Sequence, residues 1–506
     1  MRLLCSLVVL LLLVFAVHLQ CHGLLLPLTN TLSSLPAANG TAVPIHHLLR
    51  SSSLRSAARH RRHRARGRAG NLPPPGAHRR QLSLPLSPGS DYTLSLSVGP
   101  PSAAAPVSLF LDTGSDLVWF PCAPFTCMLC EGKPTPGRHS APSPPPPDSR
   151  RVPCASPLCS AAHSLAPPAD LCAAARCPLE DIETGSCASR ACPPLYYAYG
   201  DGSLVAHLRR GRVGLAASMA VDNFTFACAH TALGEPAGVA GFGRGPLSLP
   251  AQLSPQLAGR FSYCLVAHSF RPDRLVRPSP LILGRSPDGA GGLGGGGGAA
   301  EADFVYTPLL HNPKHPYFYS VALEAVSVGA ARIPARPELG HVDRAGNGGM
   351  VVDSGTTFTM LPNETYARVA GAFAGAMAAA GFARAEGAEA RTGLSPCYRY
   401  DASDRAASRA VPPLALHFRG DATVALPRRN YFMGFRGGEE EEGRPAGVGC
   451  LMLMNGGEAA GEGDGPAGTL GNFQQQGFEV VYDVDAGRVG FARRRCTDLW
   501  DSLSRR

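Results

Sequence analysis

Apolar and polar residues alternate over many short stretches between Tyr92 and Phe491. In residues 92–98 every second position is apolar, and comparable stretches recur along the chain. A period of two is typical of β-strands that bury one face. A longer helical pattern is rare, and residues 367–380, which Gly381 ends, are one candidate. The sequence therefore predicts a mainly β fold.

Glycine and proline separate these predicted strands. The chain has 506 residues, 44% of them hydrophobic, with 58 Gly and 47 Pro. This length predicts two or three domains with sizeable cores, and the composition favours many turns. Four segments are too rich in proline, glycine or glutamate to be core, and we expect exposed loops at 142–147, 289–300, 437–443 and 456–468.

The first 23 residues have the parts of a secretory signal peptide. Arg2 supplies the positive charge, residues 7–17 are an unbroken apolar run, and Cys21 and Gly23 suit cleavage after Gly23. A membrane anchor is the alternative, but the run is short for a span. We therefore expect a secreted, extracellular protein without a stable membrane anchor.

The formal charge of +9 belongs to the N-terminal leader. Residues 1–80 hold 11 of the 47 Lys/Arg and none of the 38 Asp/Glu, so the remainder has 36 basic and 38 acidic residues, a net of −2. This balance argues against nucleic-acid binding by the main body. The basic residues 46–68 predict a short amphipathic helix followed by a solvated tail. We expect residues 24–85 to form a prosegment, with a disordered tail of no regulatory role as the alternative.

Cysteine usage also indicates the secretory route. Of 16 cysteines, Cys5 and Cys21 fall within the signal peptide, which leaves fourteen. In a secreted chain this number predicts up to seven disulfides. A zinc site around Cys127 and Cys130 is the alternative, which an oxidising compartment disfavours.

One motif occurs twice. Residues 109–115 and 350–356 each consist of three apolar residues, an aspartate, a hydroxyl residue, a glycine and a second hydroxyl residue. The aspartates, Asp112 and Asp353, are 241 positions apart, which predicts two similar lobes that each supply one carboxylate. A single copy would indicate only a turn.

Two adjacent carboxylates can hydrolyse a peptide bond. When they are close together, one pKa falls and the other rises, so the pair retains one proton and can act as base and acid at once. Gly114 and Gly355 allow backbone N–H groups to approach, and the outer hydroxyls of Ser115 and Thr356 can orient the carboxylates. Further residues expected to support the dyad by joining the two turns are Thr113 and Ser354.

These motifs resemble those of pepsin-like aspartic proteases, above all the plant nepenthesin-type branch. The resemblance covers about residues 92–496 and includes Trp119, seven positions after the first aspartate. Residues 196–203 resemble the flap hairpin, which makes Tyr199, Gly200 and Gly202 flap residues, with Tyr199 bonding to Trp119. The segments 238–245 and 469–477 resemble those that lie beside the catalytic loops, and Ser354 replaces the threonine of many relatives.

The resemblance implies a bilobal fold, with an N-terminal lobe at 86–300, a C-terminal lobe at 301–506 and an active-site cleft between them. It also implies an acid-active endopeptidase for protein or peptide substrates, a monomer that needs no cofactor or metal. For a plant enzyme of this kind we expect the apoplast or cell wall, with the vacuole as the other destination. The prosegment arginines would face carboxylates around the cleft at neutral pH. The alternative is a non-catalytic inhibitor or cell-wall binding protein on the same fold, because fold does not fix function.

The resemblance further implies particular covalent features. Cys397 would pair with Cys450, and Cys264 with Cys496; the other implied pairs are Cys122–Cys228 and Cys127–Cys130. The pairing of the six cysteines within 154–192 stays open. Sequons place candidate glycosylation at Asn223 and Asn363.

Overall fold

The structure is a computed structural model of the chain. It describes residues 24–30, 44–65, 92–130, 144–199, 202–216, 219–234, 237–257, 259–268, 270, 277–284, 303–401, 404–441, 444–457 and 465–505. The expected signal peptide and the loop 289–300 lie outside these ranges. So do the expected lobe boundaries near residues 85 and 300, which therefore stay predictions.

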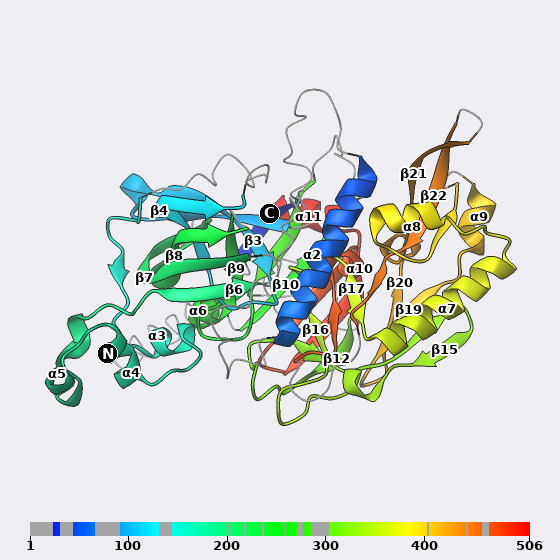
Figure 1. Cartoon of the computed structure of the whole chain (residues 1–506). Coiled ribbons are helices and arrows are strands. Elements are labelled where there is room, and N and C mark those ends of the chain that lie inside the picture. Colours follow the sequence, from blue (N-terminus) through cyan, green and yellow to red (C-terminus); the bar gives the residue numbers. More distant parts are fainter. Residues whose placement is uncertain are drawn as a thin grey trace, which may run out of the picture.

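The fold is mainly β and bilobal, as the sequence predicted. Figure 1 shows the strands of the first half and those of the second half on opposite sides of helix α2 (Ile45–Ala65). In the described part of the first half the strands are β2 (Tyr92–Val98), β3 (Ala105–Asp112), β4 (Trp119–Met128), β5 (Arg150–Arg151), β6 (Leu195–Tyr199), β7 (Gly202–Ala216), β8 (Met219–Leu233), β9 (Gly238–Gly241), β10 (Arg260–Cys264) and β11 (Ser279–Leu283).

Short helices lie between the strands of the first half. Three of them, α3 (Pro157–Ala162), α4 (Pro168–Ala174) and α5 (Leu179–Glu183), lie in the segment 154–192 that holds six cysteines, and α6 (Leu249–Leu257) precedes β10. Single 3₁₀ turns occur at Pro101–Ala103 and Ser186–Ser189.

The second half repeats this plan with more helix. Its described strands are β12 (Val305–Leu310), β13 (Ser320–Val321), β14 (Leu323–Val328), β15 (Ala331–Pro334), β16 (Met350–Val352), β17 (Thr359–Leu361), β18 (Cys397–Arg399), β19 (Leu414–Phe418), β20 (Ala422–Leu426), β21 (Phe432–Glu441), β22 (Arg444–Leu451), β23 (Leu453–Asn455), β24 (Gly468–Leu470), β25 (Phe478–Asp483) and β26 (Arg488–Arg493). Its helices are α7 (Asn363–Ala379), α8 (Glu386–Thr392), α9 (Arg405–Ala410), α10 (Asn472–Gln475) and α11 (Cys496–Ser504), with 3₁₀ turns at Pro337–Leu339 and Arg428–Asn430.

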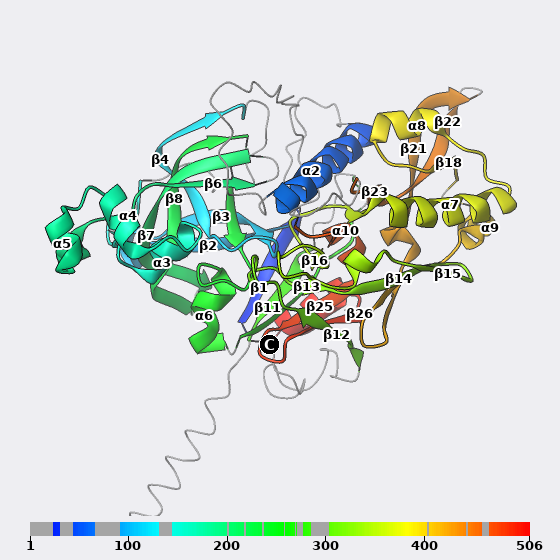
Figure 2. The ribbon, with the colours of Figure 1, turned by 60° about the horizontal axis from the view of Figure 1, so that its bottom comes forward.

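A six-stranded antiparallel sheet joins the two halves. Its order is β1 (Leu24–Asn30), β11, β10, β25, β26 and β12. Figure 2 shows β1 running beside β11 near the middle of the molecule. Phe261 of β10 stacks on Tyr482 of β25 with ring centroids 4.6 Å apart, so the sheet carries part of the shared core. The leader is thus integrated into the fold at its first strand.

Some local expectations are confirmed and others are wrong. Helix α7 occupies the predicted segment, and Gly381 follows it at a φ of 81°. The expected loop 437–443 is instead largely a hairpin, in which Glu440 pairs with Pro445 and Glu441 with Arg444. Backbone hydrogen bonds suffice for such a hairpin, so its polar composition concealed it.

The leader helix also departs from expectation. It spans 21 residues, and the expected solvated tail is wrong for the side chains of Arg59, His60 and His63, which are buried. Within the described ranges, we find no helix that is both long and apolar enough to cross a bilayer.

Candidate active site

Asp112 is the last residue of strand β3, which runs parallel to the neighbouring strand β9. β3 pairs with β9, so Asp112 lies opposite Gly241. The carboxylate is buried. Its Oδ1 accepts the backbone N–H of Gly114 at 2.9 Å, and its Oδ2 accepts the hydroxyl of Ser115 at 2.5 Å. The expected support of the first aspartate is therefore present in the geometry.

Asp353 follows strand β16 in the same manner. β16 pairs in parallel with β24, and the backbone N–H of Asp353 donates to the carbonyl of Leu470 at 3.0 Å. Its Oδ1 accepts the N–H of Gly355 at 2.8 Å and its Oδ2 the hydroxyl of Thr356 at 2.5 Å. The segments 238–245 and 469–477 thus lie beside the two aspartate loops, as the sequence predicted.

Thr113 and Ser354 join the two loops reciprocally. The Thr113 hydroxyl donates to the carbonyl of Val352 at 2.9 Å and accepts the Ser354 N–H at 2.9 Å. The Ser354 hydroxyl donates to the carbonyl of Leu111 at 3.0 Å and accepts the Thr113 N–H at 3.0 Å. These four buried hydrogen bonds hold the loops in one relative position. The Ser354 hydroxyl therefore takes part in this junction in the same way as the Thr113 hydroxyl.

The two glycines keep the carboxylates together. A Cβ on Gly114 would lie 2.7 Å from Oδ1 of Asp353, and a Cβ on Gly355 would lie 2.6 Å from Oδ1 of Asp112. Each glycine therefore faces the opposite aspartate, and any side chain at either position would push the two acids apart.

Helix α2 places a cation on both aspartates. Arg59 donates from Nη2 to Oδ1 of Asp112 and from Nε to Oδ2 of Asp353, the latter at 3.2 Å. Nε2 of His63 lies 3.3 Å from the same Oδ2. The His63 ring also packs edge-on against Phe318, with centroids 5.0 Å apart. The leader therefore occupies the space directly over the dyad.

These side chains of α2 change the protonation of the site. Burial alone raises the pKa of Asp353, but Arg59 and His63, together with the Thr356 hydroxyl, outweigh burial and hold that pKa well below its usual range. A dyad that works as acid and base needs one retained proton, and Arg59 favours the state without it.

His60 is buried beside Thr469 of β24, and within the described residues no ion pair to it is found. Its Nδ1 lies 3.0 Å from the Thr469 hydroxyl, while its buried Nε2 has no hydrogen bond to any residue that the structure describes. A Cβ on Gly456 would lie 2.8 Å from that Nε2, so a glycine makes room for the ring. Burial, and then Arg64, His63 and Arg61, lower the pKa of His60 to about 3.

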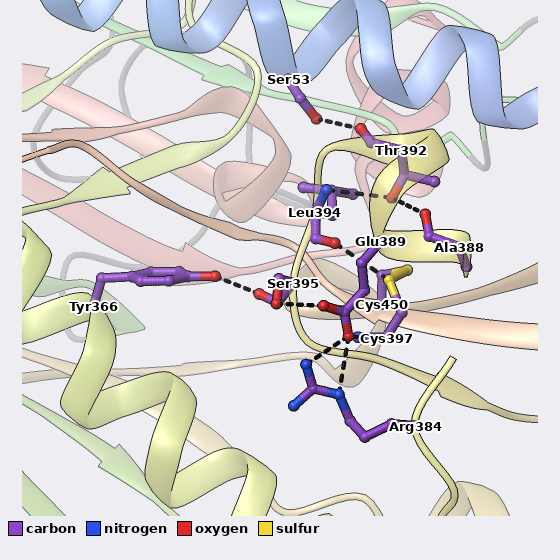
Figure 3. The surroundings of a disulfide bond; sticks show 10 residues. All are labelled: Ser53, Tyr366, Arg384, Ala388, Glu389, Thr392, Leu394, Ser395, Cys397 and Cys450. Atoms are coloured by element: carbon purple, nitrogen blue, oxygen red, sulfur yellow. Dashed lines mark hydrogen bonds and ion pairs between the residues drawn. A yellow bond between two sulfur atoms is a disulfide. The ribbon is translucent and has the colours of Figure 1, made fainter. Parts of the chain in front are cut away.

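Polar contacts anchor α2 along the second lobe. The Ser53 hydroxyl donates to the carbonyl of Thr392 at 3.1 Å, at the end of α8 (Figure 3). Glu389 of the same helix accepts the N–H of Cys397 at 2.9 Å, and Cys397 is joined to Cys450. This disulfide therefore braces the surface that receives the helix.

Two tyrosines that no sequence motif marks, Tyr263 and Tyr482, lie beneath the dyad. The hydroxyls of Tyr263 and Tyr482 lie 2.7 Å apart, and Tyr263 also donates to the side chain of Gln475. Burial raises the pKa of Tyr263 well above its usual value. Each tyrosine stands in a strand among other apolar residues, as an ordinary core tyrosine would. Their place under the dyad is therefore visible only in the structure.

The flap residues are partly described. Strand β6 pairs with β7 up to Tyr199 opposite Gly202, which forms the expected hairpin. The Tyr199 side chain and Gly200 lie outside the described residues, so the bond from Tyr199 to Trp119 stays a prediction. Trp119 is buried in the core of the first lobe.

Seven disulfides join the fourteen cysteines of the body. They are Cys122–Cys228, Cys127–Cys130, Cys154–Cys172, Cys159–Cys192, Cys177–Cys187, Cys264–Cys496 and Cys397–Cys450. Within the described ranges, Cys159, His163 and Cys192 lie close enough to share a metal ion, but the disulfide between the two cysteines leaves no thiolate ligand. The same holds for the expected zinc alternative at Cys127 and Cys130.

The two candidate glycosylation sites lie in different lobes. Asn223 is exposed on β8 with a φ of 61°, and Asn363 begins α7, where its side chain accepts from Asn455 at 2.8 Å. Both stay predictions.

Comparison with known families matches most of the chain. A family model described as xylanase inhibitor N-terminal matches residues 92–285, and one described as xylanase inhibitor C-terminal matches residues 318–493. A probable aspartyl protease of Arabidopsis thaliana is 54% identical over 437 residues, which cover 83% of this chain and 85% of that protein. The aspartic proteinase nepenthesin-1 of Nepenthes gracilis is 29% identical over 411 residues, which cover 80% of this chain and 78% of that protein.

Solved structures share the fold at low identity. The crystal structure of edgp superposes with a TM-score of 0.58 at 18% identity, covering 81% of this chain and 94% of that one. The basic 7S globulin from soybean superposes with a TM-score of 0.53, also at 18% identity. The superposition covers 80% of this chain and 93% of that one.

Proposed function

Because the chain belongs to the plant pepsin-like aspartic protease family, we propose that it is an aspartic endopeptidase in which Asp112 and Asp353 act on one shared water. One carboxylate takes a proton from the water as the oxygen attacks the peptide carbonyl. The other, protonated, gives its proton to the leaving nitrogen. The protein then needs no metal or cofactor for this reaction.

The matched environment of the two aspartates carries the proposal. Each carboxylate accepts one glycine N–H and one outer hydroxyl, and Thr113 and Ser354 fix their relative position. Two like charges held together do not ionise equally, so the free pair keeps one proton over an acidic range. Such a pair is active in acid.

We further propose that the full chain is a latent precursor. Arg59 pairs with both carboxylates and stabilises the state in which neither holds a proton. Helix α2 also fills the position that a substrate must reach. Removal of residues 24–85 would uncover the site, after a signal peptide at 1–23 has directed a monomeric glycoprotein to the cell exterior or the vacuole.

A non-catalytic binding protein is the second candidate. The two family models are described as xylanase inhibitors, and the fold is shared with edgp and the basic 7S globulin. The complete set of dyad hydrogen bonds favours the enzyme, because a binding protein has no need to orient two carboxylates in this way.

Inhibitor titration of the acid-treated protein tests the proposal. Cleavage of an unfolded protein substrate should be highest in acid and should stop at about one equivalent of a pepstatin-type transition-state analogue, since such analogues bind far more tightly than substrates. A processed protein that cleaves nothing at any pH and does not bind the analogue would support the binding protein instead.

A further inference from the structure

A basic surface lies on the outer face of the first lobe, formed by Arg151, His207, Arg209 and His230. Arg151 of β5 is directly opposite Arg209 of β7, so the two side chains share a face. His207 is two residues before Arg209 and shares that face as well. We call these four residues the outer basic face.

A β-bulge adds the fourth residue. The ladder between β7 and β8 shifts register where Val205 pairs with Thr231 and Ala206 with Ala229, which leaves His230 as the extra residue. Bulges redirect a side chain out of the regular alternation. Here the rings of His207 and His230 meet edge to face with centroids 4.7 Å apart.

The cations are held in place rather than dispersed. Arg209 donates from Nε to the Ser149 hydroxyl at 2.8 Å and from Nη2 to the Ser149 carbonyl at 2.7 Å. Nη1 of Arg151 lies 3.3 Å from Nδ1 of His207. Two arginines directly opposite each other in a sheet are destabilising, so this arrangement is unfavourable until an anion joins it.

Among the residues that the structure describes, the charged groups that act on His207 and His230 are all basic. Burial, and then Arg151, His230 and Arg209, lower the pKa of His207 to about 4. Burial, Arg151 and Arg209 likewise lower the pKa of His230. Among the residues that the structure describes, no carboxylate contributes to either shift. Since residues 81–506 carry a net charge of −2, this surface is a local feature and not a reflection of overall charge.

An exposed aromatic ring extends the same face. Tyr196 of β6 is directly opposite Val205, which is two residues before His207. Tyr196 is 69% exposed and Val205 39%, whereas the neighbouring Leu195 is buried. An aromatic ring beside a row of cations can stack on a flat ring of a ligand while the cations pair with its acidic groups.

We propose that the outer basic face and Tyr196 bind a linear acidic polysaccharide, whose carboxylate or sulfate groups pair with the cations while a sugar ring stacks on Tyr196. The binding groups are spread over four strands, β5, β6, β7 and β8, with about 5 Å between strands and about 6.6 Å between alternate residues. This spacing suits a chain of charged sugars better than a single ion.

Single-stranded nucleic acid has similar requirements, but two observations favour the polysaccharide. The body of the protein is weakly acidic, which opposes general nucleic-acid binding. Its seven disulfides indicate an oxidising compartment. A bound anion would raise the pKa values of His207 and His230, so affinity should increase as the pH falls.

Retention of the full chain on immobilised polygalacturonate and on heparin, at low salt and pH 5, tests the proposal. The variant Arg151→Gln/Arg209→Gln should bind at least one of these polymers about tenfold more weakly, a loss typical of removing two phosphate-like contacts. The control Arg405→Gln/Arg409→Gln removes the same charge from exposed positions on α9 and should change binding less than twofold. Tyr196→Ala, which changes no charge, should also weaken binding several-fold.

Several results would overturn the proposal. They are a wild-type protein that binds neither polymer, equal losses in the two arginine variants, and binding to a single-stranded oligonucleotide but not to the polysaccharides. Thermal melts check the fold of each variant, and if the arginine variant does not fold, His207→Gln and Tyr196→Ala together decide the question. The assay measures binding only, so its outcome is independent of whether the protein cleaves peptides.

Discussion

Nε of Arg59 lies 3.2 Å from Oδ2 of Asp353, although 294 residues separate them in the chain. The same guanidinium also pairs with Asp112. One side chain of the leader therefore contacts both halves of the repeated motif. The proposed latency of the precursor therefore has two causes, the charge on Arg59 and the bulk of α2.

Arg59→Gln in the full chain should weaken latency. Glutamine cannot stabilise two ionised carboxylates. Because removing one partner of a buried charge pair costs several kcal/mol, the unprocessed variant should cleave a fluorogenic peptide at least about tenfold faster than the unprocessed wild type near neutral pH. Arg61→Gln is the matched control, because Arg61 is exposed on the same helix. Equal latency of the two variants at every pH would contradict the role given to Arg59.

His60 should help acid to release α2. With the helix docked, the pKa of His60 is about 3; when the helix leaves, it returns toward 6.5. The undocked state therefore binds more protons below pH 6.5, and docking weakens by about 1.4 kcal/mol per pH unit down to about pH 3. Arg61, His63 and Arg64 face His60 from its own helix, and all of them oppose its protonation.

The variant His60→Gln cannot take up this proton, so its precursor should stay latent to a pH lower by about one unit. Asp353, whose pKa is held low while α2 is docked, still contributes to release in acid, so the midpoint shifts and release is not abolished. Hydrogen exchange of α2 across a pH series measures the midpoint. His47→Gln, exposed on the same helix, is the control; an unchanged midpoint in His60→Gln would remove His60 from the trigger.

Thr113→Val should loosen the contact between the two catalytic loops. The variant loses a hydroxyl that donates to Val352 and accepts from Ser354, and the free energy of unfolding should fall by about 1–3 kcal/mol. Catalytic turnover should fall while substrate binding changes little, because the two acids lose alignment. Chemical denaturation and steady-state kinetics measure both effects, and a variant with wild-type turnover would argue against this role.

Removal of the Cys397–Cys450 disulfide should destabilise both the second lobe and the docking of α2. The bond closes 53 residues, for which chain entropy predicts about 4 kcal/mol, against about 3 kcal/mol for the 10 residues closed by Cys177–Cys187. Alanine pairs at the two sites can be compared by thermal melting. Only the first pair should also reduce precursor latency, since it braces the helix that Ser53 contacts.

The sequence predicted most of the fold and the main site, for physical reasons. The repeated motif identified Asp112 and Asp353, because the strand and turn chemistry around each is local. The basic leader predicted cations near carboxylates, but not which arginine, since that depends on how α2 docks across the lobes. Tyr263 and Tyr482 carried no signal, because a core tyrosine and a tyrosine that supports a site have the same sequence pattern.

Turnover of the processed Asp353→Asn protein tests the central claim most directly. Asparagine has nearly the shape of aspartate but cannot exchange the required proton, and the two acids act as one unit, so the loss should be at least about 10²-fold. The double variant with Asp112→Asn should be little worse than either single variant. If processed Asp353→Asn, free of contaminating protease, kept more than about a tenth of wild-type turnover, the shared-proton mechanism would be wrong.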